Sequence, residues 1–173
     1  MPIGTSIAAT RHPSGQQSSL LSAPNAQAGL RWRVLIVESH TSIREMLRVI
    51  LEEYSDLIEV VGEASDADQA VELAKTISVD LVLIDTHLPN SVDATNQIKH
   101  LVPQVVILGT STEYAPYLYN AMIAAGAVAF VRMEDASSLL FRSIVFAMCT
   151  YGPKHMHMPG TQQAVHQKSA SFA

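Results

Sequence analysis

The chain has 173 residues, of which 48% are hydrophobic and 16% are charged, with 11 lysines and arginines against 16 aspartates and glutamates. Such a composition can form a hydrophobic core, which excludes a wholly disordered chain. The net charge of −5 argues against a protein whose main task is to hold nucleic-acid phosphates or anionic lipids. The single cysteine, Cys149, excludes an intramolecular disulfide, and no apolar run approaches the roughly 18 residues of a membrane span. We therefore expect a cytoplasmic protein that contacts neither nucleic acid nor membrane.

The composition divides the chain into one domain and two tails. Residues 1–30 are rich in Ser, Ala, Gln and Gly, contain no acidic residue and show no apolar periodicity, which predicts a disordered N-terminal tail. Residues 152–173 begin with Gly152-Pro153, which stops a helix, and predict a second disordered tail. Residues 31–151 remain as a single folded domain of common size.

Short apolar runs alternate with amphipathic segments along this domain. The apolar runs predict strands at 34–37, 58–61, 81–84, 105–108 and 127–131. The first helix is expected to begin with a capping box of Ser42 and Glu45, and the second opens at Asp66. Further helices are predicted near 92–101, from Pro116 to Gly126, and over 136–150.

Five strand–helix units with nearly continuous apolar strands predict a parallel sheet covered on both faces. Because crossovers are right-handed, the simplest topology is a doubly wound, flavodoxin-like (βα)5 sandwich of three layers with a five-stranded parallel sheet. In such folds ligands bind beyond the carboxyl ends of the strands, so candidate functional residues are sought there.

Two acidic residues, Glu38 and Asp85, end strands that should be neighbours in this sheet. Two adjacent carboxylates repel each other unless a cation intervenes, and Mg²⁺ suits one or two carboxylates with water. Hydroxyls of Thr110 or Ser111 and the guanidinium of Arg132 could contact an anion beside the metal, with Asp85 as nucleophile of a phosphoryl transfer. The alternative is that these polar residues merely mark strands ending at the surface.

Several segments resemble the receiver domain of response regulators, a CheY-like family, and most of all receivers of the NarL/LuxR type. The resemblance is carried by VLIVESH at 34–40, VVGEA at 60–64, LVLID at 81–85 followed by Leu88-Pro89, and AGA at 125–127 followed by Phe130-Val131. It covers roughly Arg33 to Met148.

The resemblance implies that Asp85 accepts a phosphoryl group from a sensor histidine kinase or phosphotransfer protein. It also implies Mg²⁺ held by Glu38, Asp85 and the backbone carbonyl of His87, with Ser39 as a weak ligand where the family has a second acid. Beyond self-phosphorylation on Asp85 no enzyme activity is expected.

Other family positions are altered. The position at which the family carries its switch hydroxyl is occupied by Gly109, Thr110 or Ser111, depending on the direction of counting. Arg132 is the cation nearest the expected lysine, but gapless counting places Met133 there. Phe130 stands at the switch aromatic.

We therefore expect an atypical receiver that is either phosphorylated on Asp85 or acts without phosphorylation as an interaction module. A small hydrolase that forms an aspartyl phosphate is a remote alternative.

The resemblance also implies a partner surface on the fourth helix, the fifth strand and the last helix. Tyr114, Tyr117 and Tyr119 precede or open the fourth helix, and tyrosine is favoured at interfaces, although some of these could simply pack on the sheet. The last helix is apolar beyond one core face, with Phe141 and Val145 as interface candidates for a homodimer. Residues 152–173 lack the pattern of a DNA-binding module, so output through protein contacts is expected.

Overall fold

The computed structural model describes residues 31–113 and 115–153; the tail predicted at 1–30 lies outside this part, as does the tail predicted at 152–173 except for its first two residues. The strands are β1 (Trp32–Val37), β2 (Ile58–Ala64), β3 (Leu81–Asp85), β4 (Val106–Ser111) and β5 (Ala129–Arg132). The helices are α1 (Thr41–Glu52), α2 (Ala67–Thr76), α3 (Ser91–Leu101), α4 (Pro116–Ala125) and α5 (Ala136–Tyr151). A 3₁₀ turn, Met133–Asp135, joins β5 to α5. In the described ranges no helix combines the length and apolarity needed to cross a bilayer.

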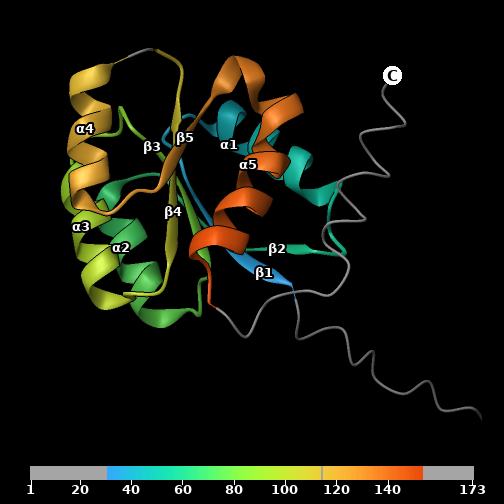
Figure 1. Ribbon diagram of the computed structural model, residues 1–173, viewed down its shortest axis with the longest axis horizontal. Helices are drawn as coiled ribbons and strands as arrows, with labels where there is room; N and C mark the ends of the chain where they lie inside the picture. The colour runs from blue at the N-terminus through green and yellow to red at the C-terminus, as the bar shows by residue number, and fades with distance from the viewer. Residues whose placement is uncertain (1–30, 114, 154–173) are drawn as a thin grey trace, which may run out of the picture.

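The five strands form one parallel sheet in the order β2-β1-β3-β4-β5. Helices α2, α3 and α4 cover one face of the sheet, and α1 and α5 cover the other (Figure 1). This is the doubly wound, flavodoxin-like three-layer arrangement that the sequence predicts. Its strand order reverses direction between β1 and β3, which places a crevice at their carboxyl ends.

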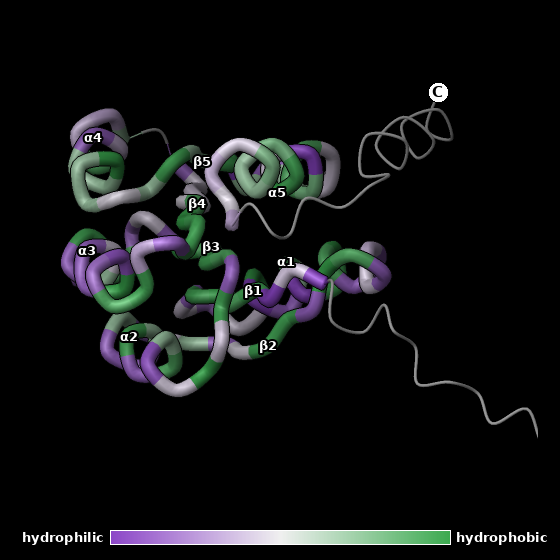
Figure 2. Tube along the Cα trace, turned by 60° about the horizontal axis from the view of Figure 1, so that its bottom comes forward, coloured by the Kyte–Doolittle hydropathy of each residue, from purple (hydrophilic) through white to green (hydrophobic). Residues whose placement is uncertain are grey.

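Two hydrophobic clusters hold the layers together, one on each face of the sheet. Alternate residues of the central strands point into different clusters: Val34, Ile36 and Leu83 pack beneath α1 and α5, whereas Leu35 and Ile84 pack beneath α2 and α3. The apolar central strands run between the two helical layers (Figure 2). Burial of each such side chain contributes about 1.5–3 kcal/mol, which explains why the strands read as continuous apolar runs.

The helix ends agree with the sequence at three of four points. Asp66 caps α2 by accepting a hydrogen bond from the Gln69 backbone N–H at 2.8 Å, Pro116 lies in the first turn of α4, and Gly126 ends α4 with φ of 117°. The capping box predicted at Ser42 is wrong, because α1 begins at Thr41 and its N-cap, His40, makes no side-chain capping bond. The polar groups of His40 bind Glu38 instead.

The edge strand β2 contains a bulge that changes which face its last residues occupy. Val34 pairs with Val60, but Leu35 pairs with Gly62, so that Val61 is an extra residue on β2. Because side chains alternate along a strand, one extra residue reverses the facing of all that follow. Glu63 therefore pairs with Ile36 and lies on the α1 side of the sheet.

Candidate functional site

Polar residues that are buried meet at the carboxyl edge of β1, β3 and β4. Glu38 follows β1, Asp85 ends β3, and Thr110 lies near the end of β4. Asp85 and Thr110 are direct partners in the register of β3 and β4, so their side chains leave the sheet on the same face. Glu38, Asp85 and Thr110 are 2%, 8% and 1% exposed, which is unusual for residues at a surface edge. Burial of this kind argues against the alternative that they only mark strand ends.

Glu38 is held by its own loop. Its Oε1 accepts a hydrogen bond from the His40 backbone N–H at 2.8 Å and lies 3.0 Å from His40 Nδ1. Its backbone N–H donates to the Ala64 carbonyl at 3.0 Å. From the sequence, His40 is expected to flank the crevice with a surface or hydrogen-bonding role, and it makes these contacts with Glu38.

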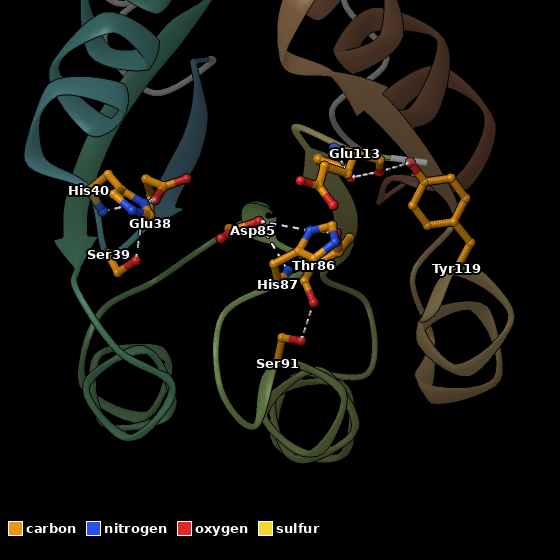
Figure 3. A network of polar contacts seen from close by, with 10 residues as sticks. Glu38, Ser39, His40, Asp85, Thr86, His87, Ser91, Glu113 and Tyr119 are labelled. Atoms are coloured by element: carbon orange, nitrogen blue, oxygen red, sulfur yellow. Dashed lines mark hydrogen bonds and ion pairs between the residues drawn. The ribbon is translucent and has the colours of Figure 1, made fainter. Parts of the chain in front are cut away.

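The carboxylate of Asp85 lies between the Glu38–His40 pair and His87 (Figure 3). Its Oδ1 accepts the His87 backbone N–H at 3.0 Å, and His87 Nδ1 is 3.9 Å away. Burial raises the pKa of Asp85 above its ordinary value, and the negative charge of Glu38 raises it further. The backbone hydrogen bond from His87 and the imidazoles of His87 and His40 oppose that rise in pKa.

The side chains at this edge offer few oxygen ligands to Mg²⁺. Glu38 and Asp85 supply two carboxylates, which is within the range that Mg²⁺ accepts when water completes its shell. Ser39, where a further acid would stand, is exposed, and its Oγ lies 3.3 Å from His40 Nδ1. Within residues 31–113 and 115–153, no group of three or more His, Cys, Asp or Glu side chains is arranged to hold a metal ion. The fit is therefore that of a weak magnesium site.

Three residues of β4 were candidates for the switch hydroxyl, and they lie in different surroundings. Thr110 is the register partner of Asp85. The Ser111 hydroxyl is engaged with the backbone of Glu113, to which it donates and from which it accepts at 3.2 Å. Gly109 faces the other layer, where the Phe130 ring fills the space above it. Thr110 is thus the hydroxyl best placed toward Asp85.

The structure does not bring Arg132 to Asp85. Arg132 pairs in register with Ser111, whereas Val131 pairs with Thr110, so Arg132 leaves the sheet on the opposite face from Thr110. Its guanidinium forms an ion pair with Glu134, and its side chain is about half exposed. Met133, the gapless counterpart of the family lysine, packs against the apolar cluster beneath α5.

The predicted aromatic residues fall into two groups. Phe130 stacks on Tyr119 with ring centroids 4.5 Å apart. Tyr119 Oη donates to the Glu113 carbonyl at 3.0 Å (Figure 3). Tyr119 therefore packs within the domain, as the sequence allowed, while Tyr117 is exposed. Tyr114 lies outside the described residues.

On α5, Phe141 was predicted to lie at an interface, but it is buried inside the domain. Phe141 is 7% exposed and stacks on Tyr54, with ring centroids 3.7 Å apart. Val145 is partly buried against the same cluster. The large hydrophobic side chains that α5 exposes are Leu139, Phe146 and Tyr151, because residues 141, 144 and 148 lie on the helical face that meets the sheet and α1.

The family model of the response regulator receiver domain matches residues 34–140. The transcriptional regulatory protein YdfI of Bacillus subtilis is 33% identical over 116 residues, which cover 65% of this chain and 53% of YdfI. PdtaR of Mycobacterium tuberculosis is 34% identical over 131 residues, covering 73% of this chain and 62% of PdtaR. The chain thus spans about half to three-fifths of these relatives.

The solved structures agree with this match. The response regulator domain of Thermotoga maritima CheB superposes with a TM-score of 0.63 at 26% identity, covering 69% of this chain and 97% of that domain. The strand order, the buried Asp85 at the end of β3 and the family match lead to one assignment. The chain belongs to the response regulator receiver domain family of two-component signalling.

Proposed function

We propose that this receiver domain accepts a phosphoryl group on Asp85 from the phosphohistidine of a sensor kinase or a phosphotransfer protein. The P–N bond to histidine breaks, a P–O bond to a carboxylate oxygen of Asp85 forms, and the histidine nitrogen keeps the electron pair. The observation that supports this role most is the buried Asp85 carboxylate, with Thr110 as its direct register partner and Glu38 on the neighbouring strand end. Receiver domains are generally not enzymes, and we propose none here.

Each residue of the site has a distinct part in this proposal. Asp85 must be ionised to attack, so its raised pKa reduces the reactive fraction at mildly acidic pH. The Thr110 hydroxyl donates to a phosphoryl oxygen. Glu38, Asp85 and the His87 carbonyl would hold Mg²⁺, which supplies positive charge against the phosphoryl oxygens when bound. Arg132 would have to leave Glu134 to contact the phosphoryl group.

A second candidate is a receiver that works without phosphorylation as an interaction module. It is favoured by Ser39 in place of an acid and by the occupation of the Glu38 carboxylate by His40. In either case we propose output through protein contacts, including a homodimer that would cover Tyr117 of α4 with Leu139 and Phe146 of α5, which are exposed in the single chain.

Intact-protein mass spectrometry separates the two candidates. The chain is incubated with acetyl phosphate over a wide range of Mg²⁺ concentrations, beside Asp85→Asn and Thr110→Ala. A gain of one phosphoryl group that Asp85→Asn abolishes and Thr110→Ala slows supports the receiver chemistry. A mass that never changes at any Mg²⁺ concentration rejects phosphorylation and leaves the interaction module.

A further inference from the structure

A two-armed contact from α1 holds the loop that carries Glu38. Arg44 lies in the first turns of α1, and its side chain is mostly buried, with 17% exposed. Its Nη1 donates to the Glu38 backbone carbonyl at 2.6 Å. Its Nε donates to Glu63 Oε2 at 3.1 Å. One planar guanidinium thus joins the peptide of the acidic residue to the edge strand β2.

The partner of this contact is in reach only because of the bulge in β2. If β2 continued from the Val34–Val60 pair without the bulge, so that Val61 paired with Leu35, Glu63 would pair with Val37 and lie on the α2 face, away from Arg44. With the bulge, Glu63 lies on the α1 face and forms ion pairs with both Arg44 and Arg48.

The backbone of Glu38 is consequently held at both its N–H and its carbonyl. The backbone N–H is tied to Ala64 of β2, and the carbonyl is tied to Arg44, which Glu63 of β2 holds in turn. With the backbone held, the Glu38 side chain can move only by rotation about its own bonds, and it is directed at the edge where Asp85 lies. We propose that Arg44, with Glu63, is a positioning residue for the Glu38 carboxylate.

This role rests on the proposed function for its effect on phosphorylation, since Glu38 matters there as a ligand of Mg²⁺. Partners that orient metal ligands typically change metal affinity or activity by about 10–100-fold when removed. Loss of Arg44 should therefore raise the Mg²⁺ concentration at half-maximal phosphorylation by about tenfold or more, with less effect on the maximal rate at saturating Mg²⁺.

Arg48 provides a matched control. It also forms an ion pair with Glu63, and another with Glu52 at 3.8 Å, but among the described contacts it makes none with Glu38. Arg48→Ala therefore removes a pair to Glu63 without releasing the Glu38 carbonyl. Arg44→Lys keeps the charge of Arg44 but offers a compact ammonium in place of the two-armed fork.

The experiment measures two quantities on the full chain and on Arg44→Ala, Arg44→Lys and Arg48→Ala. The first is the Mg²⁺ dependence of phosphorylation by acetyl phosphate. The second is hydrogen exchange of the His40 amide, which donates to Glu38 Oε1, with the Leu83 amide as reference for global unfolding. Relative to that reference, Arg44→Ala should speed exchange at His40 by about tenfold, while Arg48→Ala leaves it near wild type.

The outcomes separate the two proposals. If the wild-type chain takes up no phosphoryl group, phosphorylation is rejected, and exchange at His40 alone decides the role of Arg44. Equal effects of Arg44→Ala and Arg48→Ala on exchange would overturn that role, and so would full recovery of wild-type exchange and Mg²⁺ dependence in Arg44→Lys. The role is supported if both Arg44 variants, but not Arg48→Ala, show faster exchange at His40 and a higher Mg²⁺ requirement for phosphorylation.

Discussion

The close approach of the Phe130 ring to Gly109 makes Gly109→Ala an informative substitution. A Cβ at position 109 would lie 2.3 Å from Phe130 Cδ1 and 2.9 Å from Thr86 Cγ2. Carbon atoms in contact are ordinarily about 3.5–4.0 Å apart, so the ring would have to move by more than about 1 Å. Because the ring is stacked on Tyr119, this movement disturbs the contact between α4 and β5 as well.

The expected cost follows from two opposing terms. Overpacking of this kind costs about 1–3 kcal/mol, while replacing a strand glycine by alanine returns about 0.5–1 kcal/mol. Gly109→Ala should therefore lower the free energy of unfolding by about 1–2 kcal/mol, measured by urea denaturation.

A double-mutant cycle checks the cause. In a Phe130→Ala background the ring is absent, so the cost of Gly109→Ala should shrink by about 1 kcal/mol or more. An equal effect in both backgrounds, or stabilisation of the wild-type chain by Gly109→Ala, would refute the argument from the ring contact.

Three further predictions concern stability. Because the pKa of Asp85 is raised in the folded chain, its ionised form destabilises the fold above that pKa, and this cost disappears below the pKa of the unfolded chain. Asp85→Asn should therefore raise Tm in metal-free buffer at pH 7. In a pH series of thermal melts, this gain in Tm should vanish toward pH 4. Asp66→Ala removes the cap of α2 and should lower the free energy of unfolding by about 1 kcal/mol, with unchanged Tm as the contrary result. Phe141→Ala should cost about 3–5 kcal/mol in urea, whereas Phe146→Ala should change the stability of dilute protein by less than about 0.5 kcal/mol; similar losses would contradict the assignment of their faces.

The sheet could be predicted from the sequence because its strands are buried on both faces. Runs such as residues 81–84 leave no other place for four consecutive apolar side chains in a domain of this size. The end of β4 could not be predicted in the same way. Gly109 is disfavoured in strands although Thr110 favours them, and pairing with β3 and β5 extends the strand through Gly109 and on to Ser111.

The candidate site was predictable in its acids but not in its surroundings. Glu38 and Asp85 follow from strand ends alone, whereas the facing of Arg132 depends on the register between β4 and β5. Likewise, apolar residues occur all around α5, so its periodicity did not separate the buried Phe141 from the exposed Phe146. These positions are decided by contacts between segments distant in the sequence.

The bulge in β2 also bears on how the domain behaves at high concentration. In the described sheet, β2 and β5 are the two outer strands, and an outer strand offers unpaired backbone groups to other chains. The irregular pairing of β2 twists that strand away from a flat template, and Glu59 and Glu63 add charge along it. β5 is only four residues long. Both borders of the sheet thus resist strand-to-strand aggregation, which leaves the helical faces as the surfaces suited to specific association.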